Sequence, residues 1–177
     1  MNKKGSLIVL VMGLLMLLAA MVPVMAAPAT KVPASTTTIS SITVLPPPEV
    51  KITPSGFVHI RGVHFINQRT LTIGATEYDV YVVGSYDGFA NPTTGTAIIH
   101  FTAVWYVGSL TAPTSDGFSG NQESKVLDFN PVTETGGDTT AHLVLQGFGS
   151  FAQYTLKLDY EGPYEGAMNP SGYCIIP

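Results

Sequence analysis

The sequence predicts an all-β protein whose strands close into an antiparallel up-and-down barrel of about eight strands, preceded by a hydrophobic signal or anchor helix. Apolar and polar residues alternate with a period of two over most of the chain beyond residue 49. Val, Ile, Thr, Tyr and Phe dominate these runs, and no long stretch there has helical periodicity. Clusters of Gly, Asn, Asp and Pro separate the runs and predict turns.

Residues 1–26 have the three parts of a secretory signal. Two lysines precede an apolar run over residues 7–22, and Val24-Met25-Ala26 provides a site for signal peptidase. The apolar segment 7–27 is also long enough to span a bilayer, so an uncleaved N-terminal anchor is the alternative. Both readings predict a secreted or extracytoplasmic protein, attached to a membrane only through residues 7–27 if the leader is retained.

Residues 27–48 are expected to form a flexible tether between the leader and the domain. The segment is rich in Ser, Thr and Pro and ends in the triplet Pro46-Pro47-Pro48. Such a composition buries too little apolar surface to offset the entropy of ordering the chain. The domain itself is expected over residues 49–177. The alternative is that residues 39–44 form an additional edge strand of this domain.

The predicted strands of the domain differ in how clearly they alternate. The clearest are Ala97–Val107 and Tyr154–Tyr160, in which every second residue is apolar over the whole run. The remaining predicted strands are Phe57–Ile66, Leu71–Ala75, Tyr78–Val83, Lys125–Phe129, Ala141–Gly147 and a last strand, Gly172–Ile176. Turns are predicted at Tyr86–Gly88, Asn91–Gly95, Ser115–Gly117 and Thr135–Asp138.

Long neighbouring strands joined by short turns favour a barrel, because consecutive antiparallel pairing closes the sheet and removes its edges. Only 11% of the residues are charged, so an open sheet would be prone to edge-to-edge association. A β-sandwich is the alternative architecture. A homo-oligomer formed through the weakly charged outer wall, with His100, Thr102 and Tyr106 in the contact, is a further alternative.

One hairpin resembles a known family. The apolar run from Ala141 to Leu145 leads into Gly147-Phe148-Gly149-Ser150-Phe151, and the alternating run Tyr154–Leu158 returns. This hairpin resembles the late hairpin of allene oxide cyclase-like and dirigent-like proteins, which carry a Gly-x-Gly-x-Phe corner. The resemblance implies an eight-stranded antiparallel barrel with an apolar interior, in which glycines permit the corner and Phe151 plugs the barrel end. It carries over no functional residue.

Charge and cysteine content restrict the partners. The chain has a formal net charge of −4, and two of its basic residues lie in the leader. Nucleic acid is excluded as a partner because phosphate binding needs clustered Lys and Arg; electrostatic attachment to anionic lipid is excluded likewise. Cys174, the single cysteine, is interpreted as a small buried residue of the last strand. An intermolecular disulfide or a reactive thiol is the alternative.

The sequence contains no recognisable catalytic, cofactor-binding or metal-binding motif, so we expect no catalytic residue, no cofactor and no metal. His59 and His64 are five residues apart and would point to opposite faces of a regular strand. His100 and His142 could meet only if their strands pair, and a third ligand with recognisable spacing is missing. Calcium loops, nucleophile elbows and phosphate-binding loops are also missing.

Phe101, Trp105, Tyr154 and Tyr160 are the candidate ligand-binding residues, because they share the apolar face of long strands. Small barrels fill this face with side chains, whereas wider ones leave a pocket for an apolar ligand. The sequence therefore favours a non-enzymatic secreted or cell-surface domain that binds a small apolar ligand or serves as a structural surface module. An isomerase- or cyclase-type barrel enzyme is the alternative.

Overall fold

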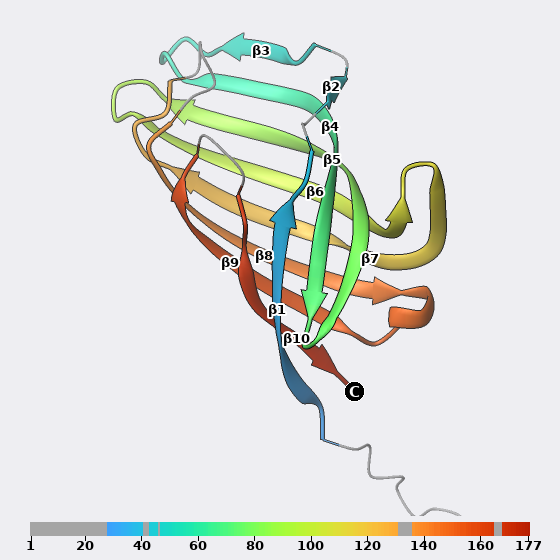
Figure 1. Cartoon of the computed structure of the whole chain (residues 1–177). Coiled ribbons are helices and arrows are strands. Elements are labelled where there is room, and N and C mark those ends of the chain that lie inside the picture. The colour runs from blue at the N-terminus through green and yellow to red at the C-terminus, as the bar shows by residue number, and fades with distance from the viewer. Residues whose placement is uncertain (1–27, 41–42, 46, 131–135, 165–167) are drawn as a thin grey trace, which may run out of the picture.

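The computed structural model is all-β apart from one helical turn (Figure 1). It describes residues 28–40, 43–45, 47–130, 136–164 and 168–177. The signal or anchor helix predicted for residues 1–26 lies outside these residues. Within the described residues, no helix is long and apolar enough to cross a membrane.

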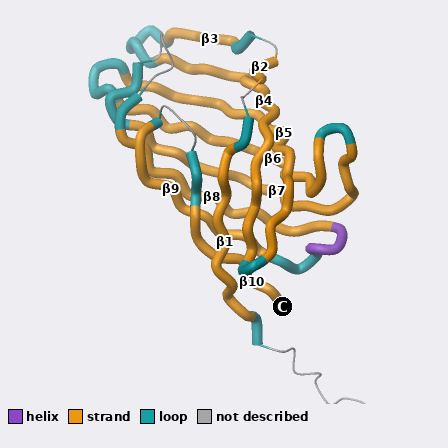
Figure 2. The backbone as a smooth tube through the Cα atoms, viewed as in Figure 1, coloured by secondary structure: helices purple, strands orange, loops and turns teal. Residues whose placement is uncertain are grey.

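The described strands form one sheet in which every pairing is antiparallel. They are β1 (Thr30–Thr38), β2 (Thr43–Leu45), β3 (Glu49–Ile52), β4 (Val58–Ile73), β5 (Thr76–Asn91), β6 (Thr96–Ser109), β7 (Ala112–Val126), β8 (Asp138–Phe148), β9 (Thr155–Pro163) and β10 (Ser171–Ile176). A single 3-10 turn, η1 (Gly149–Phe151), lies between β8 and β9 and is purple in Figure 2.

Strands β1 and β4 to β10 close into the predicted barrel, which excludes the sandwich alternative (Figure 1). From β4 to β10 each strand pairs with the next along the chain. β1 then closes the ring, because it pairs with β10 on one side and with the second half of β4 on the other. The short strands β2 and β3 pair with the first half of β4. Closure gives the backbone groups of each barrel strand a partner on both sides.

The barrel begins earlier than the sequence predicts, because part of the expected tether is a strand. Thr30–Thr38 is β1, and its residues Ala34 and Thr36 are buried. Thr and Val favour strands, and small inward side chains fit where the ring closes, but composition does not reveal the partner strands on both sides. Of the described residues in the alternative edge strand over residues 39–44, Thr43 and Val44 lie in a strand, β2, and Ile39 and Ser40 do not.

Two of the predicted turns are wrong. Tyr86–Gly88 lies inside β5 and Ser115–Gly117 lies inside β7, whereas Asn91–Gly95 does connect β5 to β6. At Gly117 a Cβ atom would stand 2.0 Å from the carbonyl oxygen of Trp105. This glycine therefore permits neighbouring strands to approach closely. Glycine commonly has this role within a strand, as well as its role in turns.

Strand boundaries are also displaced from their predicted places. The predicted break between Ile66 and Leu71 falls in the middle of β4, and the predicted strand Lys125–Phe129 contains only the end of β7. Most of β7 was missed because its sequence is rich in Gly, Ser and Asn, which are depleted in strands or favour turns. Pairing with β6 and β8 stabilises it despite this composition.

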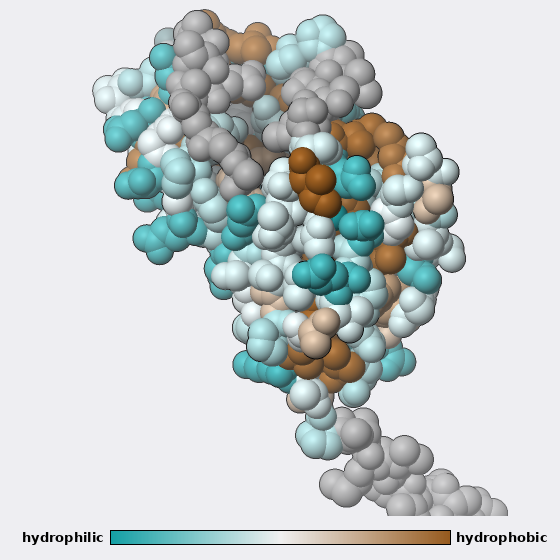
Figure 3. All heavy atoms as spheres, in the orientation of Figure 1, coloured by the Kyte–Doolittle hydropathy of each residue, from teal (hydrophilic) through white to brown (hydrophobic). Residues whose placement is uncertain are grey.

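The predicted apolar faces point into the barrel. On β6, Ile99 and Trp105 are buried, whereas the intervening His100 and Thr102 are exposed. In the face shown in Figure 3 the wall is mostly pale and teal, with small separate brown patches. The fully buried side chains of the main core cluster are those of Leu71, Val80, Phe118, Leu145, Leu156, Leu158 and Cys174.

Phe151 fills the interior at the β8–β9 corner. Its ring centroid lies 5.0 Å from that of Phe118, 5.3 Å from that of Tyr78 and 5.6 Å from that of Tyr154. Gly149 has a φ of +64°, a conformation that glycine adopts without the strain of a side chain. These are the structural roles expected for the corner, whereas the family resemblance itself stays a prediction.

Gly149→Ala is expected to destabilise the protein more than Gly62→Ala. Both glycines have a positive φ, but a Cβ at Gly62 meets nothing within 4 Å. At Gly149 it would stand 2.1 Å from Asp116 Oδ1, which accepts a hydrogen bond from the Ser150 backbone N–H. We expect losses of about 1 kcal/mol for Gly62→Ala and about 2 kcal/mol or more for Gly149→Ala in urea denaturation. Equal losses would contradict tight packing at this corner.

Candidate functional site

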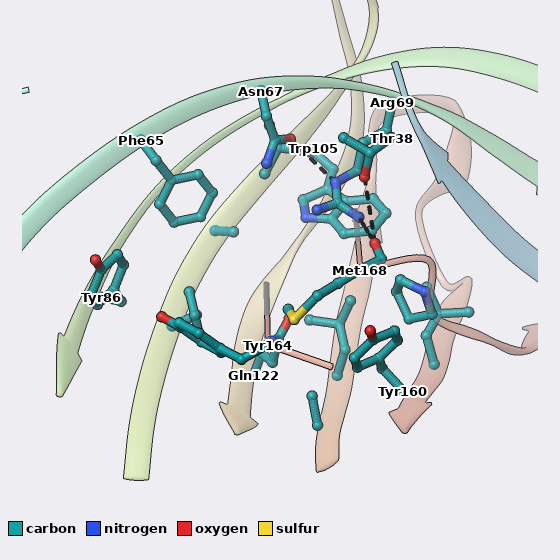
Figure 4. A pocket seen from close by; sticks show the side chains of 17 residues that line it. Thr38, Phe65, Asn67, Arg69, Tyr86, Trp105, Gln122, Tyr160, Tyr164 and Met168 are labelled. Atoms are coloured by element: carbon teal, nitrogen blue, oxygen red, sulfur yellow. Dashed lines mark hydrogen bonds between the residues drawn. The ribbon is translucent and has the colours of Figure 1, made fainter. Parts of the chain in front are cut away.

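A cavity of about 370 Å³ lies inside the barrel. The core of the barrel has a main cluster around Phe118 and Leu145 and a smaller one around Ile60 and Ile99, and Tyr86 and Phe101, which line the cavity, pack against both. Small-ligand sites in proteins have volumes of about 300–1,000 Å³. Its lining comprises Thr38, Phe65, Asn67, Arg69, Val82, Tyr86, Phe101, Ala103, Trp105, Gln122, Ala141, Leu143, Leu158, Tyr160, Tyr164, Met168 and Pro170 (Figure 4).

Three of the four candidate ligand-binding residues line this cavity. Phe101 and Trp105 reach it from β6, and Tyr160 reaches it from β9. Tyr154 is outside the lining and packs against Phe151 in the main core cluster. The alternation therefore identified which residues face the interior. It did not show which of them line a cavity and which pack against other side chains in the core.

Small residues on three adjacent strands account for part of the space. Gly84, Ala103 and Gly120 lie opposite one another in the register of β5, β6 and β7. The ring of Phe65 occupies the position above Gly84, where a Cβ atom would stand 2.6 Å from its Cζ atom. A larger residue at position 84 would compete with Phe65, and one at Ala103 would extend into the cavity, whereas a Cβ atom at Gly120 would stand 2.1 Å from the carbonyl oxygen of Val144 on β8.

Arg69 is the only charged residue among the described lining residues, and it forms several polar contacts. Its Nε donates a hydrogen bond to Asn67 Oδ1 at 3.2 Å. Its Nη1 donates to the carbonyl oxygen of Met168 at 2.9 Å and to Thr36 Oγ1 at 3.5 Å. The guanidinium carbon also lies 5.8 Å from the ring centroid of Trp105, within the range of a cation–π contact. These contacts orient the side chain in the pocket (Figure 4).

Burial lowers the pKa of Arg69 from 12.5 to about 10, because the charged form loses hydration. The side chain nevertheless remains protonated at neutral pH, so the site carries a positive charge. Sequence analysis missed Arg69 and Asn67 because it treated the residues between Ile66 and Leu71 as a break. The signal was present: Phe65, Asn67, Arg69 and Leu71 continue one inward face without interruption.

The histidines lie outside the cavity. A register shift in β4 between Ile60 and Val63 puts both His59 and His64 out of the core, which corrects the expectation that they point to opposite faces. His100 and His142 do not share a pair of strands, because β7 lies between them. In the described part of the chain, no group of three or more His, Cys, Asp or Glu side chains could hold a metal ion.

Cys174 is fully buried in β10, as interpreted from the sequence. Burial raises the pKa of its thiol above the ordinary 9.0, so less thiolate is present than in the unfolded chain. We expect Cys174 to react with dithionitrobenzoate at least about 100-fold more slowly in the folded protein than in urea. Equal rates of this reaction in the folded and the unfolded protein would contradict burial. The raised pKa of the thiol also makes the free energy of unfolding fall as the pH rises above the ordinary thiol pKa.

Comparison with protein-family models, with curated proteins and with solved structures finds no match to this chain. The structure itself defines the class as an antiparallel β-barrel with an interior cavity. Since a barrel supports many unrelated functions, a function has to be argued from the cavity and its residues.

Proposed function

We propose that the protein is an exported β-barrel that binds a small apolar molecule in its interior cavity. The observation that supports this most is the unfilled space beside Trp105, about 370 Å³ in volume. Its lining is mostly aromatic and aliphatic with a few polar groups, the usual composition of a small-molecule site. Export is proposed from the leader sequence alone.

A barrel with a purely structural role has no use for this space. Protein interiors are packed to the density of organic crystals, and few of their voids exceed a water molecule. An unfilled interior forfeits dispersion contacts and so costs stability. A ligand that occupies the space would restore those contacts, which favours binding over the structural-module alternative.

The lining also favours binding over catalysis. A general acid or base works best with a pKa near the operating pH. Arg69 has its pKa lowered by burial to about 10, so it stays protonated at neutral pH and is better suited to holding an anion than to exchanging a proton. This favours binding over the isomerase- or cyclase-type alternative.

A neutral fluorescent probe tests the proposal directly. N-phenyl-1-naphthylamine is apolar and becomes brightly fluorescent when it leaves water. We expect saturable binding of one probe per protein with a Kd of about 1–10 µM, together with a change in the emission of Trp105, the only tryptophan. Fluorescence that rises linearly without saturation, or no response at all, would contradict an interior site.

A further inference from the structure

We propose that the ligand carries an anionic head group, a carboxylate or similar oxyanion, which pairs with Arg69 while its apolar body lies among the aromatic side chains of the cavity. This inference rests on the proposed binding function and narrows it to one chemical class, amphipathic anions. Three observations carry it: the charge of the lining, the unused donors of Arg69, and the way the pocket is arranged around it.

The first observation is an uncompensated charge. Of the described lining residues Arg69 is the only charged one, and none of the described carboxylates forms an ion pair with it. The contacts between histidine and carboxylate side chains in the described part of the chain, His100–Glu123 and His142–Asp159, are solvent-exposed on the outer wall. Arg69 is only partly exposed, and a charge that has lost part of its hydration is stabilised by a partner of opposite sign. A bound anion would supply the missing partner.

The second observation is the hydrogen bonding of the guanidinium group. Every acceptor that it uses is neutral: an amide oxygen, a backbone carbonyl oxygen and a hydroxyl oxygen. These bonds engage Nε and Nη1, and Nη2 donates no hydrogen bond to any described residue. A guanidinium group binds carboxylates through parallel N–H donors, so donors remain for an oxyanion.

The third observation is how the pocket is arranged around Arg69. In Figure 4, Arg69, Asn67 and Trp105 gather at one side of the pocket, while Tyr160, Tyr164 and Gln122 lie toward the other. The contacts with Asn67, Met168 and Trp105 hold the guanidinium group in place before a ligand arrives. A preorganised charge beside an apolar chamber suits a ligand with a charged head and an apolar body.

Displacement of N-phenyl-1-naphthylamine by decanoate and by 1-decanol tests the inference at neutral pH. The two competitors share an alkyl chain and differ in the charge of the head group. In the native protein decanoate is expected to displace the probe at about tenfold lower concentration than 1-decanol, because hydrogen bonds to a charged partner are the stronger ones. In R69M this preference should disappear, and in R69K part of it should remain.

Arg61 provides the matched control. It is the other arginine of the chain, it is exposed, and its Nε donates a hydrogen bond to His59 Nε2 at 3.1 Å. R61M removes the same charge from the protein without touching the cavity, so the preference for decanoate should be unchanged. Loss of the preference in R61M as well would show a general effect of net charge and would overturn the assignment to Arg69.

The outcomes separate the two proposals. If both competitors displace the probe and 1-decanol is equal or better, the cavity binds apolar ligands but the anionic class is wrong. If the probe does not bind, the proposed function fails and this inference fails with it. If R69M does not fold, the comparison of competitors in the native protein and in R69K still decides.

Discussion

Phe118→Ala is expected to lower the free energy of unfolding by about 3–5 kcal/mol, the usual cost of removing a buried phenylalanine side chain. Phe118 is fully buried in β7, where the strand register sets it opposite Trp105 on β6 and Gly147 on β8. Its ring also packs against the ring of Phe151 at 5.0 Å. Truncation would extend the cavity into the filled part of the barrel. Urea denaturation followed by circular dichroism measures the loss.

Phe89→Ala is the matched control for this prediction. Phe89 lies on β5 with 42% of its surface exposed, and it stacks on Phe57 at 5.0 Å. Its truncation removes a surface contact and leaves the interior unchanged, so we expect a loss of less than about 1.5 kcal/mol. Similar losses for Phe118→Ala and Phe89→Ala would mean that the interior is not packed around Phe118.

Ala141→Trp is expected to weaken binding of N-phenyl-1-naphthylamine by about 100-fold or more, equivalent to about 2.7 kcal/mol. Ala141 lies on β8 and lines the cavity, with Tyr160 opposite it on β9. An indole at this position would extend into the space that the ligand needs. Because the added atoms enter a void and not a packed region, the loss of stability should stay below about 1–3 kcal/mol.

Thr140→Trp separates occlusion of the cavity from a general effect of tryptophan. Thr140 precedes Ala141 on the same strand, and its side chain is exposed on the opposite face. This variant should bind the probe as the native protein does. Weaker binding in both variants, or in neither, would place the probe somewhere other than beside Ala141.

The fold was largely predictable because strand periodicity is a local property. In β9 the inward residues Leu156, Leu158 and Tyr160 alternate with polar outward residues, so a period of two assigns the faces. In β6 the inward residues are apolar too, although its outward face also carries Ile98 and Val104. Length and closely spaced turns then favoured a closed sheet. One strand that the sequence did not predict, β1, depends on pairing with β10 and β4, strands that are distant in the sequence. Its composition is that of a linker, and tertiary pairing overrides it.

The candidate site was predictable only in part. Phe101, Trp105 and Tyr160 were identified from their faces, and all three line the cavity. Whether the interior is filled at a given level of the barrel depends on the summed volume of side chains from all eight strands. The sequence therefore could not distinguish Tyr154, which lies outside the cavity lining, from the three residues that line it. Arg69 was missed because a charged residue between polar neighbours is typical of a turn, although its position on the inward face is regular.

A crystal structure of the protein with N-phenyl-1-naphthylamine tests the central claim, an interior ligand site, most directly. The probe is expected inside the barrel, in contact with Trp105, Leu143 and Tyr160, which line the cavity. Probe density on the outer wall alone, with the interior closed by rearranged side chains, would contradict an interior binding site.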